Sequence, residues 1–349
     1  MKIYTNLFKR IISLENLFLA WDKFKADKQT KSDVQEFAFC LEKNIFQLHK
    51  DLKSGNYTHG SYTSFYIHDP KLRHIHKAEV RDRVFHHAVF QILNPLFEPT
   101  FIATSFSCRV NKGTHKGVEC VEKMLRVVSK NYTKPCFVLK CDVKKFFDSV
   151  DHDILLNILG RTVKDDVVMR LMKEIVESFS SGRSTLFRWC GIPIGNLTSQ
   201  LFANVYMNEF DHFVKHELKV KYYARYTDDF VIIHNDIKYL KGLISKINIF
   251  LHDNLRLALH PGKVSINKAS RGVDFLGYII FPYHKMVRTK TKNRVFRKLR
   301  QKIRVYKVGE LPEESLEQTL NSYLGVFSHA NAFGLGEKLK NQYWFWINE

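Results

Sequence analysis

The sequence has few of the features that mark secreted, zinc-binding or membrane-spanning proteins. Its six cysteines form no Cys-x-x-Cys pair and no Cys/His cluster with zinc-ligand spacing, which excludes a zinc finger and favours reduced thiols. No apolar run approaches the ~18 residues that a transmembrane helix needs. The first residues lack the apolar core of a secretory signal, and repeats and low-complexity tracts are absent. We therefore expect a cytoplasmic globular protein.

Acidic residues are scarce relative to basic ones. The 349 residues include 55 Lys and Arg but only 35 Asp and Glu, which gives a formal net charge of +20. A surplus of this size rarely serves the fold, and it implies a polyanionic partner, either nucleic acid or an anionic membrane surface. A chain of this length can bury a large core, and we expect it to form two or three lobes.

Two of these few acids, Asp228 and Asp229, are adjacent within an otherwise apolar stretch. Residues 221–234 carry aromatic and β-branched side chains on both sides of the pair, which predicts a β-hairpin with the acids at its tip. Carboxylates held at a rigid tip favour Mg²⁺ over zinc, because Mg²⁺ prefers oxygen ligands. A lone Asp-Asp pair would be better interpreted as a solvated turn, so the interpretation depends on the accompanying motifs.

Two further motifs lie upstream in the chain. Residues 137–141 predict a buried strand that ends at Asp142, and a carboxylate in that position is costly unless it pairs or binds a cation. The alternative, an acid that caps the next helix, fits Asp148 or Asp151 better. Residues 191–200 contain two glycines and a proline, which predict an irregular loop before a helix whose N-terminus can approach phosphates.

The order of predicted strands and helices indicates an α+β fold. A strand at 137–142, the hairpin, a helix from about 240 to 251 and the alternating Leu255, Leu257 and Leu259 predict a split βαβ sheet. A further small sheet is predicted over residues 273–280.

Two segments of the chain are strongly cationic. Residues 71–77 alternate basic and apolar side chains, which predicts either a strand that grips phosphates or an ordinary solvated edge strand. Residues 288–307 contain ten basic and no acidic residues. Their apolar positions keep helical phase, so we expect an amphipathic helix that faces nucleic acid or a membrane.

Together these motifs resemble those of a bacterial reverse transcriptase over the whole chain. The segment ending at Asp142, the 191–200 loop, Tyr226-Thr227-Asp228-Asp229, Lys263 and Phe275-Leu276-Gly277-Tyr278 are similar to five successive motifs of that family's palm. The resemblance implies a right-hand polymerase with an N-terminal helical segment (1–60), fingers (61–135), a palm (136–286, with 161–190 a helical part near the fingers) and a thumb (287–349).

The resemblance also implies an RNA-directed DNA polymerase and a set of site residues. Two Mg²⁺ ions, replaceable by Mn²⁺, would be held by Asp142, Asp228, Asp229 and the Val143 carbonyl. The nucleotide would meet Arg73, Lys77, Phe147, Ile194 and Gly195, with Phe147 excluding a ribose 2′-hydroxyl and Lys263 protonating pyrophosphate. Template RNA, primer and cDNA would meet Arg109, Gln200, Tyr226, Gly277, Arg294, Arg297, Lys298, Arg300, Lys302 and Arg304. For Phe147, core packing is an alternative to the sugar-excluding role.

One departure from the family pattern bears on the biological role. Most reverse transcriptases have Gln where this chain has Ile194 and Ser-Pro after the following glycine; the sequence Ile194 to Gln200 instead resembles enzymes of diversity-generating retroelements. Those enzymes copy RNA with errors at adenines and use a small basic accessory protein. Antiphage-defence reverse transcriptases and a non-catalytic, maturase-like RNA-binding protein are alternatives. A membrane-surface protein is disfavoured by the palm motifs, and the sequence leaves the oligomeric state open.

Overall fold

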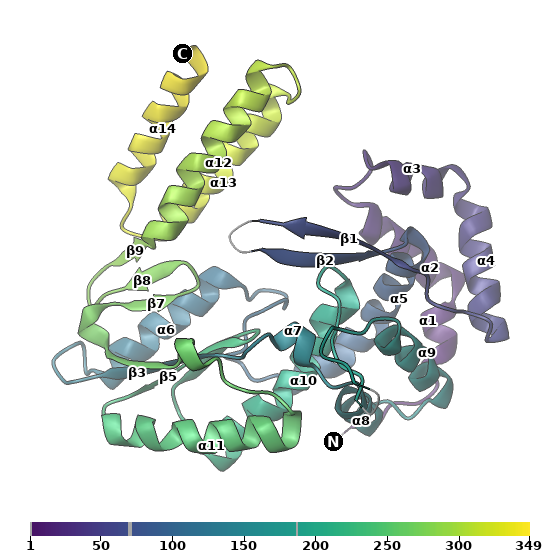
Figure 1. Cartoon of the computed structure of the whole chain (residues 1–349), viewed down its shortest axis with the longest axis horizontal. Coiled ribbons are helices and arrows are strands. Elements are labelled where there is room, and N and C mark those ends of the chain that lie inside the picture. Colours follow the sequence, from purple (N-terminus) through teal and green to yellow (C-terminus); the bar gives the residue numbers. More distant parts are fainter. Residues whose placement is uncertain (1, 69–71, 186–187) are drawn as a thin grey trace.

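The computed structural model describes residues 2–68, 72–185 and 188–349. N-terminal helices gather at the right of the view, a sheet lies at the lower left, and three C-terminal helices stand together at the upper left (Figure 1). Within the described residues, no helix is both long and apolar enough to cross a membrane.

The N-terminal part is helical because its apolar residues recur at helical spacing. Leu17, Trp21 and Phe24 form one buried stripe on α2, which packs on α5. Gly55 ends α4 in the left-handed conformation (φ +76°), where its N–H caps the Leu52 carbonyl. The helices are α1 (Phe8–Ile12), α2 (Leu14–Lys25), α3 (Ser32–Phe39), α4 (Leu41–Ser54) and α5 (Val80–Phe97).

An antiparallel hairpin interrupts these helices and extends toward the centre of the molecule (Figure 1). It consists of β1 (Tyr62–Ile67) and β2 (Arg73–Ala78). The strand predicted for residues 71–77 is therefore confirmed as β2, and Lys71 lies outside the described residues. From His74 to Lys77 the β2 residues alternate between two cavities, with His74 and His76 at one and Ile75 and Lys77 at the other. Arg73, the first residue of the strand, lines the cavity of His74 and His76.

The central sheet has the strand order β4-β5-β3-β6, with every neighbour antiparallel. Its strands are β3 (Phe137–Asp142), β4 (Tyr223–Tyr226), β5 (Asp229–His234) and β6 (Ser265–Lys268). This order confirms the predicted split βαβ arrangement. The predicted fourth strand at residues 255–259 is wrong, because α11 runs to Leu255 and the edge position is taken by β6.

Both faces of this sheet are covered, which explains why its inner strands β3 and β5 are mostly apolar. Leu139 and Ile232 belong to one core, with residues of α10 and α11, whereas Val138 and Ile233 belong to the other, with residues of α6 and the C-terminal helices. The covering and connecting helices are α6 (Thr114–Val128), α7 (Phe146–Ser149), α8 (His152–Thr162), α9 (Asp166–Glu177), α10 (Leu197–His212) and α11 (Ile237–Leu255).

A second antiparallel sheet leads into the C-terminal helices. The predicted sheet over residues 273–280 is confirmed as part of the three-stranded set β7 (Val273–Phe275), β8 (Tyr278–Ile280) and β9 (Lys285–Val287). The predicted cationic helix is α12 (Thr289–Lys307), which buries Val295, Leu299 and Ile303 against its neighbours. The neighbouring helices are α13 (Glu313–Ser328) and α14 (Phe333–Asn348). The α+β class is confirmed, whereas the domain boundaries stay predictions.

Candidate active site

Three carboxylates come together where strands β3 and β5 meet. Asp142 ends β3 and pairs in register with Asp229, the first residue of β5. Asp228 lies in the two-residue turn just before β5, and its carbonyl accepts a hydrogen bond from the Val143 N–H at 3.1 Å. The antiparallel register therefore places Asp142 and Asp229 side by side, although 87 positions separate them in the chain.

A buried ion pair is hydrogen-bonded to the turn that precedes β5 and helps to fix its conformation. Thr227 has φ +55°, a conformation that β-branched residues rarely adopt. Its carbonyl accepts a hydrogen bond from Arg225 at 2.9 Å, and its hydroxyl donates to Ser107 at 2.6 Å. The Arg225 guanidinium in turn makes two hydrogen bonds to Asp211 of α10, at 2.7 and 2.5 Å, and both side chains are 0% exposed. These contacts hold the turn in a conformation that its sequence disfavours.

Burial and charge make the site unfavourable for ionised acids. Burial raises the pKa of Asp229 to about 6, with the neighbouring Asp142 and Asp228 carboxylates adding to the effect and the Lys140 ammonium opposing it. The Asp229 Oδ1 atom is buried and has no hydrogen-bond partner among the described residues. A buried oxygen of this kind is normally satisfied, so the site is suited to an added cation.

Two lysines offset the acidic charge. Lys263 Nζ lies 2.7 Å from Asp142 Oδ1, and Lys140 Nζ lies 3.7 Å from Asp229 Oδ2. Among the described residues, no three His, Cys, Asp or Glu side chains form a group that could hold a metal by themselves. Mg²⁺ does not need such a cage, because it is usually bound by one or two carboxylates together with water and substrate phosphates. The all-oxygen donor set therefore fits Mg²⁺ or Mn²⁺ once a substrate contributes ligands.

A cavity of 590 Å³ opens beside β2 and α7. Cationic side chains from three separate segments line it, namely Arg73 from β2, Lys145 at the start of α7 and Arg183 from the loop after α9. Ile194 lines the same cavity, and its carbonyl accepts a hydrogen bond from the His76 N–H at 3.2 Å. Guanidinium and ammonium groups gathered in this way are suited to bind phosphate oxygens.

Comparison with known proteins identifies the family to which this site belongs. A family model described as "Reverse transcriptase (RNA-dependent DNA polymerase)" matches residues 67–280, which is more than half of the 349 residues. The chain belongs to the reverse transcriptase family. The right-hand polymerase fold is therefore confirmed.

Relatives of this reverse transcriptase include intron-encoded proteins. The group II intron-encoded protein LtrA of Lactococcus lactis subsp. cremoris is 24% identical over 260 residues, which cover 70% of this chain and 42% of LtrA. Protein YkfC of Escherichia coli (strain K12) is 25% identical over 282 residues, which cover 70% of this chain and 71% of YkfC. The chain thus spans less than half of LtrA. A truncated apo telomerase from Candida tropicalis is a solved structure with a TM-score of 0.48 and 14% identity, covering 66% of this chain and 55% of that one.

The other predicted nucleotide-binding residues of the reverse transcriptase lie in different surroundings. The Phe147 side chain is half-buried and packs against the hydrophobic core. The centre of its ring lies 5.4 Å from the centre of the Phe146 ring. Lys77 faces away from the cavity of Arg73 and pairs with Asp33 of α3 at 2.7 Å. It lines a second cavity of 380 Å³ together with Gly195 and Gln200. Gly195 has φ +123°, a conformation that favours glycine at this loop.

The predicted template and primer residues Arg109, Gly277 and Tyr226 also differ in their availability. The Arg109 side chain is 6% exposed and bonds Glu98, the Ile102 carbonyl and the Ser105 carbonyl, so it holds its own loop together. Gly277 (φ +91°) sits in the two-residue turn between β7 and β8, where its carbonyl accepts a hydrogen bond from the Arg288 N–H. Tyr226 pairs in register with Asp229 and is half-buried.

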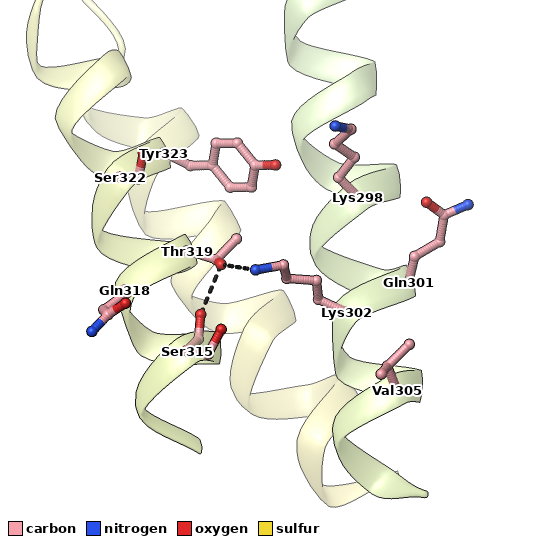
Figure 2. Close-up of a pocket in the computed structure, with 9 residues that line it drawn as sticks. All are labelled: Lys298, Gln301, Lys302, Val305, Ser315, Gln318, Thr319, Ser322 and Tyr323. Atoms are coloured by element: carbon pink, nitrogen blue, oxygen red, sulfur yellow. Dashed lines mark hydrogen bonds between the residues drawn. The ribbon is translucent and has the colours of Figure 1, made fainter. Parts of the chain in front are cut away.

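The six predicted nucleic-acid-binding cations of α12 fall on two sides of the helix. Arg294, Lys298 and Lys302 recur every fourth residue and are half-buried, whereas Arg297, Arg300 and Arg304 are exposed. Figure 2 shows a cavity of 530 Å³ between α12 and α13, where Lys302 donates a hydrogen bond to the Thr319 hydroxyl at 2.7 Å. The residues around it are mostly polar, namely Lys298, Gln301, Lys302, Val305, Ser315, Gln318, Thr319, Ser322 and Tyr323.

Several residues near the site were not predicted from the sequence. Lys140 could have been found, because it stands two positions before Asp142 in a strand and therefore shares its face. Lys145, Arg183 and the Arg225–Asp211 pair carried no recognisable signal. Their positions depend on a turn, a loop and a helix that the sequence does not bring together locally.

Proposed function

We propose that this reverse transcriptase is an active RNA-directed DNA polymerase that extends a primer by nucleotidyl transfer. The observation that carries the proposal is the register pair Asp142–Asp229 with Asp228 beside it, held at a buried tip. In the reaction, the primer 3′-hydroxyl loses its proton to water, and its oxygen forms a bond to the α-phosphorus of a dNTP. The bond from that phosphorus to the bridging oxygen of the β-phosphate breaks, and pyrophosphate leaves with the bonding electrons.

The three carboxylates and the Val143 carbonyl would hold two Mg²⁺ ions, for which Mn²⁺ can substitute. In two-metal sites such ions stabilise the attacking and the leaving oxygen of an in-line displacement. The unsatisfied Asp229 Oδ1 and the raised pKa of Asp229 fit this role, because a divalent cation favours the ionised carboxylate that burial disfavours. Lys263 stands at Asp142 and would donate a proton to the departing pyrophosphate.

The nucleotide would lie between the carboxylate tip and the cavity of Arg73. Arg73 would bind the triphosphate there, and Lys145 and Arg183 would share that negative charge. Phe147 would pack against the sugar and reject a ribose 2′-hydroxyl, and Ile194 and Gly195 would face the new base pair. Template RNA and the primer–cDNA duplex would meet Gln200, Tyr226, Gly277 and the cationic face of α12.

The proposal is tested by conservative substitution at the tip. Asp228→Asn and Asp229→Asn keep side-chain size but remove one negative charge each, and we expect either to reduce dNTP incorporation on an RNA template by about 100-fold or more. The control is RNA affinity in the same preparations, measured by fluorescence anisotropy, which should stay near that of the unmodified protein. Normal incorporation by both variants with Mg²⁺ or Mn²⁺ would refute the proposal and favour a non-catalytic RNA-binding protein.

Ile194 supports a finer proposal, error-prone copying of the kind found in diversity-generating retroelements. Its side chain lines the nucleotide cavity but carries no hydrogen-bonding group, so it cannot read the incoming base as the amide of Gln could. A small basic accessory protein would then be a partner. Antiphage defence is the alternative biological role, and copying errors spread evenly over all template bases would favour it.

A further inference from the structure

The outer side of α12 forms a groove with α14 that differs from the cavity shown in Figure 2. The groove has a volume of 380 Å³ and is lined by Phe296, Arg297, Arg300, Gln301, Arg304 and Trp346. Three guanidinium groups and two aromatic rings thus share one small surface, and the groove contains no acidic side chain. Only Gln301 lines both this groove and the cavity on the α13 side.

The arginines of the groove are available to a ligand. The side chains of Arg297 and Arg304 are exposed and make no hydrogen bond or ion pair with any residue in the part of the chain that the structure describes. The Arg300 guanidinium lies 5.7 Å from the centre of the Trp346 ring. This arrangement places a cation beside a half-buried indole without neutralising the cation.

The two sides of α12 are suited to different forms of nucleic acid. Lysines and hydroxyl groups surround the α13-side cavity (Figure 2), and such groups bind backbone phosphates without contacting bases. Aromatic rings contribute little to binding a duplex from outside, because its bases are already stacked on one another. Unpaired bases stack on aromatic rings and on guanidinium planes while arginines neutralise the phosphates.

We propose that the groove formed by Phe296, Arg297, Arg300, Arg304 and Trp346 binds an unpaired segment of RNA. One base stacks on Trp346, and the phosphates beside it contact Arg297 and Arg304. This inference deepens the proposed function and rests on it in one respect, since the RNA is taken to be an unpaired part of the template molecule. The groove is lined by residues of α12 and α14, and these helices stand apart from the strands β3 and β5 that carry Asp142 and Asp229 (Figure 1).

The test compares single-stranded and duplex RNA of equal length by fluorescence anisotropy with the full chain. Trp346→Ala is expected to weaken binding of single-stranded RNA by about 5- to 100-fold, as expected for one lost base stack, and to change duplex affinity less than twofold. Trp346→Phe should retain most of the affinity, because it keeps an aromatic face. Arg297→Gln combined with Arg304→Gln should make the binding of single-stranded RNA less sensitive to salt. The slope of the log binding constant against log salt concentration should become shallower by about 1.4.

A matched variant on the other side of the same helix is the control. Lys298→Gln combined with Lys302→Gln removes the same charge from α12 and should weaken duplex binding more than single-strand binding. Equal losses for both RNA forms in the Arg297/Arg304 variant would overturn the proposal and assign those arginines to the duplex. An unaltered single-strand affinity in Trp346→Ala, or full competition by polyglutamate at matched charge, would also overturn it by showing that charge alone acts.

The inference and the proposed function fail in distinguishable ways. On a short primer–template with a single unpaired template base, Trp346→Ala should incorporate one dNTP at the normal rate. Asp228→Asn should lose that incorporation and still bind single-stranded RNA normally. If the groove variants bind single-stranded RNA normally while Asp228→Asn is inactive, the polymerase proposal stands and the groove proposal falls.

Discussion

The strongest structural prediction concerns the buried pair of Arg225 and Asp211 beneath the carboxylate tip. Both side chains are 0% exposed, and two hydrogen bonds of 2.7 and 2.5 Å join them. Asp211 also accepts a hydrogen bond from the Tyr223 hydroxyl at 2.6 Å. Removing one partner of a buried ion pair leaves an uncompensated charge, which costs about 3–5 kcal/mol.

Asp211→Asn keeps the shape of the side chain and removes its charge. We expect it to lower the free energy of unfolding by about 3 kcal/mol, the low end of that range, because the amide oxygen still accepts one hydrogen bond. The measurement is urea unfolding followed by circular dichroism. The matched control is Glu209→Gln on the same helix. Glu209 pairs with Arg161 at 2.8 Å, but the two side chains are 34% and 49% exposed, so this change should cost less than about 1 kcal/mol.

A double variant separates stability from positioning. Arg225→Met with Asp211→Leu replaces the ion pair by apolar side chains of similar volume, and such replacements are often neutral or stabilising. We expect the free energy of unfolding of the double variant to lie within about 1.5 kcal/mol of that of the unmodified protein. Polymerisation should still fall, because the Thr227 carbonyl loses the Arg225 donor that holds its φ of +55°.

Three results would refute this reasoning. An Asp211→Asn protein as stable as the Glu209→Gln control would show that the pair is not buried in solution. A double variant that is stable and polymerises at the normal rate would show that the pair packs the core but does not position the tip. A double variant far less stable than Asp211→Asn would contradict the estimate that the ions can be exchanged for apolar groups.

Three further predictions concern the site itself. In metal-free buffer Asp229→Asn should raise the free energy of unfolding by up to about 3 kcal/mol at pH 7, because the pKa of Asp229 is about 6 in the fold against 3.8 ordinarily; urea unfolding should show the gain shrinking below pH 6 and vanishing near pH 4. Phe147→Ala should lower the ratio of kcat/KM for dNTP over rNTP by about 10-fold or more; an unchanged ratio would leave Phe147 a packing residue. Ile194→Gln should reduce errors at template adenines in sequenced products, and a uniform spectrum before and after the change would remove the error-prone proposal.

The sequence predicted the sheet and its acidic tip because both follow from short-range pattern. Strands covered on both faces are mostly apolar, so the acids Asp142 and Asp229 stand out where β3 ends and β5 begins. The helix α12 was equally visible, since Val295, Leu299 and Ile303 recur at helical spacing among ten basic residues. In these cases the local pattern and the tertiary environment agree.

The predicted strand at residues 255–259 was wrong because alternating apolar residues were interpreted as a strand paired in the sheet. Leu255 ends α11, and Arg256 then takes a left-handed conformation (φ +48°) that turns the chain. Leu257 is buried in the core as part of a loop, and Leu259 makes only an isolated bridge to Val143. The actual edge strand β6 is mostly exposed, so it lacks the apolar alternation by which strands are recognised.

The surroundings of the basic residues were harder to predict than their positions. The sequence shows that Lys77 and Arg109 are cationic, but their partners are set by how α3 packs on α5 and by how the loop after α5 closes. An ion pair contributes no periodic signal, so only the fold decides whether a cation faces a ligand or an internal acid. Arg225 is the extreme case, because a strand residue that is fully charged and fully buried contradicts the ordinary pattern of a core.

The charge balance at the tip follows from the same strands that create it. Lys140 comes from β3 itself, and Lys263 is held by the loop whose His260 N–H donates to the Asp142 carbonyl at 2.8 Å. Asp142 and Asp229 are therefore each offset by a lysine attached to an element already hydrogen-bonded to the acid's own strand. Lys140 is itself desolvated, which lowers its pKa, so the balance is partial and Asp229 keeps a raised pKa. A site balanced in this incomplete way retains an attraction for a further cation, as the proposed nucleotidyl transfer would require.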